Sequence, residues 1–165
     1  MAEAERPDGA LILQAGRVFA ADLAIAPAMT LRGGEAVDSY REPPPFDPIL
    51  DKPTDAYLEA YAFNGLVYLD ADSWRHYLPR LMEYSLTHPG AERGMVAEAV
   101  VWSLRPPDHE PPRLGSLTPP QEALVVALLE QLAFGEVPFP ERDLALQALE
   151  EWWIPGALYR EPRED

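Results

Sequence analysis

Apolar side chains recur at intervals of three and four residues along five stretches of this chain, the spacing that gathers them on one face of an α-helix. No stretch shows the strict alternation that is typical of a half-buried strand, although a short strand at Gly65–Leu69 would escape such a reading. The pattern predicts an all-α protein, a compact bundle of about five helices joined by Pro-rich extended links. The predicted helices run from Thr54 to Gly65, from Asp70 to the residue before His88, from the residues after Gly90 to Leu104, from Thr118 to Gly135 and from Pro140 to Trp153.

Local signals mark the starts of three of these helices. The run 118–121, Thr-Pro-Pro-Gln, is a capping box, in which the threonine hydroxyl and the glutamine side chain satisfy free backbone N–H groups. Thr54 and Asp70 are suited to cap the first and second helices. Pro79 lies inside the second helix and lacks an N–H group, so we expect a kink or a new start near His76–Leu78.

Residues 32–53 are rich in proline and predict an extended strap across the surface. Three consecutive prolines at 43–45 fix φ and favour the polyproline II conformation. Phe46, Ile49 and Leu50 are available to pin the strap to the core. The alternative is that the strap serves as a Pro-rich recognition ligand.

The first 28 residues are expected to form an N-terminal extension, either a helix or a partly ordered segment, before a single helical domain over residues 29–165. As a helix, the extension would turn Leu11, Ala15, Val18 or Phe19, and Leu23 toward the protein. Acidic residues stand where a signal peptide needs positive charge, and Arg17 and Asp22 interrupt the apolar stretch. The sequence therefore predicts a cytoplasmic protein without a membrane anchor.

The charge balance narrows the range of partners. The chain of 165 residues carries 28 acidic and 13 basic residues, for a formal net charge of -15, and has no cysteine. Such a surface repels nucleic-acid phosphates and anionic membranes, so neither is an expected partner. Acidity of this kind serves either general solubility or attraction to a basic protein partner.

No residue spacing predicts a catalytic, metal or cofactor site. The three histidines form no His-Glu-x-x-His pairing, and the serines lie in no Gly-x-Ser-x-Gly turn. No cofactor is therefore expected. The alternative to a binding protein is an enzyme of unrecognised class, with a pocket lined by His76, Tyr77 and Asp72.

Aromatic and cationic residues supply the candidate interaction residues. Trp152 and Trp153 point about 100° apart on a helix, so they cannot both lie at the centre of one buried stripe. With Tyr159 and Arg160 following, the pair predicts a partner-binding patch. The alternative is burial against the C-terminal segment. The candidate interaction residues are Trp74, Arg75, His76, Arg80, Trp153, Tyr159 and Arg160.

Several of these segments carry a resemblance. The helix that contains Trp-x-x-Tyr-Leu-Pro-Arg at 74–80 and the helix start Leu-Thr-x-x-Gln at 117–121 resemble an uncharacterised bacterial family known only as a domain of unknown function. The resemblance covers about residues 29–160 and implies a bacterial, cytoplasmic, globular protein. It brings no activity or catalytic residue. The function we favour from the sequence is a non-catalytic acidic domain that binds a basic protein, of immunity or inhibitor type.

Overall fold

Helices account for all the regular secondary structure that the computed structural model describes, which covers residues 7–90 and 94–161. The all-α prediction is confirmed, with eight α-helices in the described residues rather than about five. The helices are α1 (Pro7–Val18), α2 (Ala20–Leu23), α3 (Leu31–Asp38), α4 (Asp55–Gly65), α5 (Ala71–Thr87), α6 (Val96–Ser103), α7 (Pro119–Phe134) and α8 (Arg142–Ala148). Short turns η2 (Leu66–Tyr68) and η3 (Leu114–Ser116) are 3-10 helices, and η4 (Leu149–Trp153) is a π-helical turn that prolongs α8. None of the described helices is long and apolar enough to cross a membrane.

The predicted caps fix the helix starts. The Thr54 hydroxyl accepts a hydrogen bond from the N–H of Tyr57 at 3.1 Å, and the Asp70 carboxylate accepts one from Ser73 at 3.4 Å. At α7, Thr118 and Gln121 form the complete capping box. These caps confirm the starts predicted for α4, α5 and α7, because a cap depends on residues that are neighbours in the sequence.

Helix α5 continues through Pro79 without a new start. The proline removes one backbone hydrogen bond, which costs about 3 kcal/mol in an open helix. Leu78, Leu81 and Met82 beside it are fully buried, and each such side chain contributes about 1.5–3 kcal/mol of hydrophobic burial. Packing on both sides of the proline therefore holds the helix together. The expected restart is wrong, while the alternative of a kink stays a prediction.

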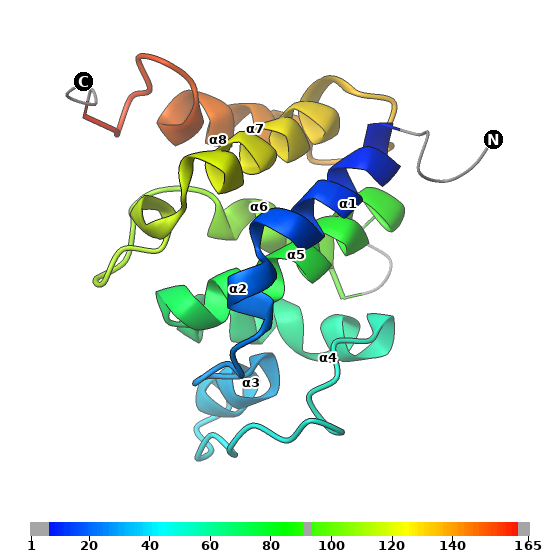
Figure 1. The fold of residues 1–165 in the computed structure, drawn as a ribbon, viewed down its shortest axis with the longest axis vertical. Coiled ribbons are helices and arrows are strands. Elements are labelled where there is room, and N and C mark those ends of the chain that lie inside the picture. Colours follow the sequence, from blue (N-terminus) through cyan, green and yellow to red (C-terminus); the bar gives the residue numbers. More distant parts are fainter. Residues whose placement is uncertain (1–6, 91–93, 162–165) are drawn as a thin grey trace.

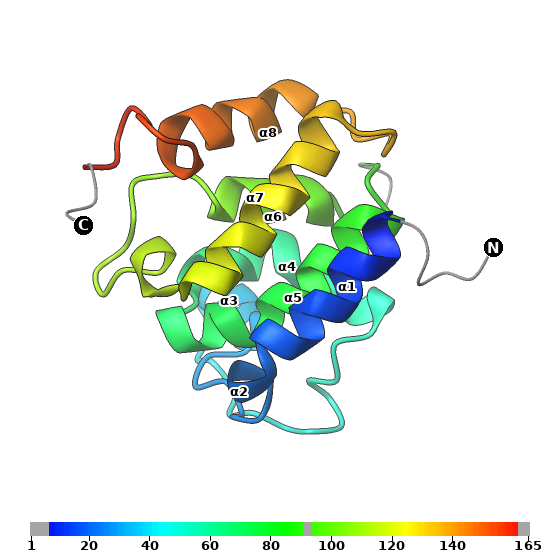
Figure 2. The ribbon, with the colours of Figure 1, turned by 45° about the horizontal axis from the view of Figure 1, so that its top comes forward.

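The helices stack along the long axis of the molecule (Figure 1). Helices α3 and α4 lie at one end, α7 and α8 lie at the other, and α5 and α6 lie between them (Figures 1 and 2). Helix α5 packs against α1, α2, α6 and α7. Its aromatic face, with Trp74 and Tyr77, is the centre of the core.

Two glycines bring α3 and α4 into close contact. A Cβ atom on Gly34 would lie 2.3 Å from the carbonyl oxygen of Gly65, and one on Gly65 would lie 2.3 Å from that of Leu31. Neither position accepts a side chain without moving backbone. The extended strap predicted over residues 32–53 is therefore wrong for residues 32–38, which form part of α3, because no periodic apolar face marks a helix there.

A polar anchor holds the strap, in place of the predicted hydrophobic one. Ile49 is 85% exposed, and Phe46 and Leu50 are also exposed, so the expectation that they pin the strap is wrong. Instead, the buried carboxylate of Asp51 accepts hydrogen bonds from Arg32 Nε and Nη2 at 3.0 and 2.9 Å and from the Tyr57 hydroxyl at 2.7 Å. The strap is thus tied to α3 and α4 by charge and hydrogen bonding.

The N-terminal segment belongs to the same core as the rest of the chain. Leu11, Ala15 and Phe19 are buried in that core, as the helical alternative predicts, whereas Leu23 is exposed. Residues 1–6 of the expected extension lie outside the described part of the chain. Helix α1 packs against α5 and α7, and α2 packs against α5, while the domain boundary before residue 29 stays a prediction.

Candidate functional site

The two tryptophans among the candidate interaction residues lie in the core. The Trp74 ring is fully buried, and its indole N–H donates to the hydroxyl of Ser103 at 3.3 Å. Trp153 is buried as well, and its indole N–H donates to the carbonyl of Leu104 at 2.8 Å. Both rings therefore hold helices together and do not face solvent, which corrects their assignment to an interaction surface.

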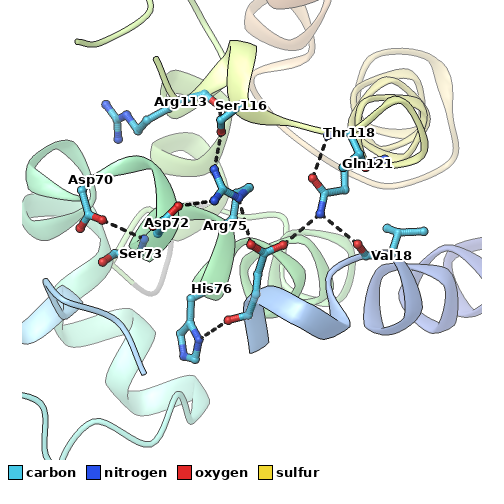
Figure 3. A network of polar contacts seen from close by, with 11 residues as sticks. Val18, Asp70, Asp72, Ser73, Arg75, His76, Arg113, Ser116, Thr118 and Gln121 are labelled. Atoms are coloured by element: carbon cyan, nitrogen blue, oxygen red, sulfur yellow. Dashed lines mark hydrogen bonds and ion pairs between the residues drawn. The ribbon is translucent and has the colours of Figure 1, made fainter. Parts of the chain in front are cut away.

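Arg75 and His76 belong to a polar network that joins α2 to α5 and α7 (Figure 3). The centre of the network is Asp22, whose carboxylate accepts from Arg75 Nε at 2.9 Å and from Gln121 Nε2 at 2.9 Å. The backbone carbonyl of Asp22 lies 3.0 Å from Nδ1 of His76. Arg75 Nη1 also donates to the Ser116 hydroxyl at 2.6 Å. The network fastens the N-terminal helices to the body of the protein.

His76, Tyr77 and Asp72, the three residues of the alternative enzyme hypothesis, contact different partners in the structure. The His76 ring meets the Tyr77 ring edge-on, with centroids 5.1 Å apart. The Tyr77 hydroxyl is buried, 3.4 Å from the hydroxyl of Tyr57, while Asp72 is exposed and pairs with Arg75. These three side chains therefore occupy different environments, and none of them lines either of the two cavities considered below.

Arg80 fastens α5 to the start of α4. Its guanidinium forms an ion pair with Asp55 and donates to the carbonyl of Pro53 at 2.9 Å. His88 Nε2 lies 3.8 Å from the same Asp55 carboxylate. Arg75 and Arg80, the arginines of α5 that the sequence offers for contact with a partner, are therefore engaged within the fold.

The C-terminal segment folds back onto α7. Arg160 pairs with Glu122 at 2.6 Å, and its guanidinium lies 5.2 Å from the centre of the Trp152 ring. A cavity of about 680 Å³ lies between this segment and α7, with Trp152 and Val126 among its lining residues. Of the C-terminal candidates, only the Tyr159 side chain is exposed.

Arg113 is not identified as a candidate from the sequence, because the neighbouring prolines predict a rigid link there. The residue is 3% exposed, and its Nη1 donates to the carbonyl of Leu66 at 3.1 Å. Burial lowers the pKa of this guanidinium, against the attraction of Asp108. Arg113 lines a second cavity, of about 480 Å³, together with His109, Phe63 and Trp102. No signal in the sequence marks a buried arginine, because burial depends on elements far away along the chain.

Among the residues that the structure describes, no group of three or more His, Asp or Glu side chains is arranged to hold a metal ion. Burial is the main cause that lowers the pKa of His109, with the positive charge of Arg113 acting in the same direction and Asp108 opposing both. His109 and Arg113, whose pKa values are both lowered, thus line the same cavity.

Comparison with known families matches residues 9–157 to a family of unknown function, DUF6714. No curated protein and no solved structure matches the chain. The family match begins at residue 9 and includes most of α1, so the shared domain begins earlier than the expected position near residue 29. Since the match spans most of the chain, the protein belongs to the family of unknown function DUF6714.

Proposed function

We propose that this protein is a non-catalytic binding domain whose acidic surface recognises a basic protein partner, as immunity and inhibitor-type proteins do. The observation that carries the proposal is the unequal use of charge in the fold: arginines are engaged inside it, whereas carboxylates face solvent. In this chain of net charge -15, the exposed charged side chains of residues 9–90 and 94–161 are therefore mostly acidic.

Five arginines form ion pairs that join separate segments of the chain, and each of these guanidinium side chains is at most 22% exposed. The pairs are Arg32–Asp51, Arg75–Asp22, Arg80–Asp55, Arg105–Glu151 and Arg160–Glu122. Because these cations are engaged within the fold, they do not offset the charge of the exposed carboxylates toward an approaching molecule.

The exposed charged side chains are accordingly mostly of one sign, negative. Within residues 9–90 and 94–161, eleven acidic side chains are exposed, against three basic ones, Arg17, Arg41 and Lys52. The exposed acids are Asp38, Glu42, Asp70, Asp72, Glu110, Glu130, Glu136, Glu141, Asp143, Glu150 and Glu161. A surface of this kind accelerates the encounter with a basic protein, and salt weakens the effect.

One part of this surface combines the acids with an exposed aromatic ring. Phe134, at the end of α7, is 67% exposed. Glu130 lies one helical turn before it, Glu136 and Glu141 follow in the link to α8, and Asp143 lies in the first turn of α8. We call these five residues the Phe134 surface. An aromatic ring near carboxylates favours the binding of lysine and arginine side chains, because their positive charge is attracted both to the ring face and to the carboxylates.

Arg142, the basic residue between Glu141 and Asp143, is held in place by backbone carbonyl groups. Arg142 donates to the carbonyls of Ala133 and Val137, at 3.3 and 2.6 Å. These bonds tie the start of α8 to the end of α7 and give the turn a fixed shape. A preformed acidic turn with an apolar anchor needs little ordering when it binds, which favours affinity.

The test is affinity capture from the source organism at low salt, followed by titration with the purified partner. We expect a stoichiometric basic protein whose affinity falls as salt rises. A triple variant, Glu130→Lys with Glu136→Lys and Glu141→Lys, should weaken binding by about tenfold or more. The matched control carries the same three charge reversals at Glu42, Glu110 and Glu161. No stoichiometric partner at low salt, or equal binding by the two variants, would contradict the proposal.

A further inference from the structure

The cavity around Arg113 has the composition of a ligand site. It lies between η2, α6 and the link that precedes η3, and its volume is about 480 Å³, within the range of small-molecule sites. Phe63, Val67 and Trp102 give it apolar walls, although each of these side chains is also exposed to solvent. Arg113 contributes a positive charge to this mostly apolar space.

Arg113 has little compensation for its burial. Nη1 bonds to the carbonyl of Leu66, while Nε is buried and has no hydrogen-bond partner. Figure 3 shows its guanidinium directed away from the network around Arg75. An arginine stays charged in a protein, so a buried guanidinium with an unused donor is costly unless an anion reaches it.

Asp108, whose carboxylate attracts the Arg113 guanidinium, already accepts four hydrogen bonds from backbone N–H groups. Asp108 Oδ1 accepts from the N–H groups of His109, Arg113 and Leu114 at 2.9, 2.7 and 2.9 Å, and Oδ2 accepts from Gly115 at 2.9 Å. Among the described residues, Arg113 forms no ion pair with Asp108 or with any other acid. Asp108 thus shapes the link, and the guanidinium is left for another anion.

We infer that this cavity binds a small aromatic monocarboxylate, with the carboxylate on Arg113 and the ring against Phe63 and Trp102. Charge favours a single negative charge on the ligand: Arg105 at the cavity is bound to Glu151 by two hydrogen bonds, and Glu98 adds a negative charge to the lining. A phosphate dianion would meet that repulsion with one available guanidinium. A carboxylate matches the planar donor pair of arginine.

The probe is phenylacetate, titrated against the full chain by NMR, with phenylacetamide as the neutral compound of the same shape. We expect saturable shifts in Phe63, Trp102 and Arg113 with phenylacetate and at least about tenfold weaker binding of the amide. Arg113→Met should weaken phenylacetate binding by a similar factor. Trp102→Ala, a change at an exposed side chain, should weaken it by about threefold to tenfold and keeps the test valid if Arg113→Met does not fold.

Tyr40→Ala is the matched control, because Tyr40 is fully exposed and is not among the residues that line the cavity. Its affinity for phenylacetate should equal that of the wild-type protein. Equal binding of acid and amide, no saturable shift with phenylacetate, or unchanged affinity in Trp102→Ala would overturn the inference. The test is independent of the Phe134 surface, whose residues line no part of this cavity.

Discussion

Replacing Asp51 with alanine should destabilise the protein by about 3 kcal/mol, because it removes one partner of a buried ion pair. The Asp51 side chain is fully buried and binds Arg32, the Tyr57 hydroxyl and the N–H of Asp47. Loss of one partner from such a pair costs about 3–5 kcal/mol. The Arg32 side chain keeps 19% of its surface exposed, so water partly replaces the carboxylate and the lower end applies.

The assay is urea unfolding followed by tryptophan fluorescence, with thermal unfolding beside it. For a chain of this length, a loss of about 3 kcal/mol lowers the Tm by about 6–12 °C. Glu42→Gln, an exposed carboxylate on the same strap, should stay within about 0.5 kcal/mol of wild type. An Asp51→Ala protein within about 1 kcal/mol of wild type would refute the view that this ion pair anchors the strap.

The same carboxylate sets a pH dependence. Burial alone raises the pKa of Asp51, but the hydrogen bonds from Arg32, Asp47 and Tyr57 outweigh it and leave the pKa below its ordinary value of 3.8. The stabilisation is therefore complete above that value and is lost as the pH falls through the folded pKa. The difference in unfolding free energy between wild type and Asp51→Asn should be constant at neutral pH and shrink in acid. A difference that grows in acid would contradict a lowered pKa for Asp51 in the folded protein.

Two further predictions concern local geometry, and both are read from urea unfolding. Gly34→Ala should cost about 1–3 kcal/mol, because its Cβ would lie 2.3 Å from the carbonyl of Gly65, whereas Gly16→Ala, with nothing within 4 Å, should stabilise α1 by about 0.5–1 kcal/mol; equal effects of the two changes would argue against the close contact of α3 and α4. Thr118→Ala should cost about 1 kcal/mol by breaking the capping box of α7, and no loss would show that the box contributes nothing to stability.

The parts of the fold that sequence reasoning predicted are those fixed by neighbouring residues. The caps of Thr54, Asp70 and Thr118 act within three residues, so the starts of α4, α5 and α7 were predictable. Helix α3 was missed because its Gly-Gly pair is unfavourable in isolation and needs the close approach of Gly65. That contact joins segments that are distant in the sequence, and no local pattern shows it.

The same limit explains why the sequence does not show which candidate residues are engaged within the fold. Arg75 and Arg80 fall outside the apolar stripe of their helix, which is typical of surface cations, but their partners Asp22 and Asp55 lie 53 and 25 residues away. Arg113 follows two prolines and resembles a link residue until the fold buries it. Sequence predicts which residue types are charged, whereas the fold decides which charges meet.

The choice of arginine over lysine connects the stability of this fold to its acidic exterior. The chain has a single lysine, Lys52, among its 13 basic residues. Arginine holds a partner through a planar set of donors, as Arg105 does with both oxygens of Glu151, and it keeps its charge when half-buried. A lysine-rich chain would spread mobile cations over the surface and offset its acids there. Fixing the cations between helices instead stabilises the bundle and leaves the carboxylates unopposed outside, so one feature of the sequence serves both the fold and the proposed attraction of a basic partner.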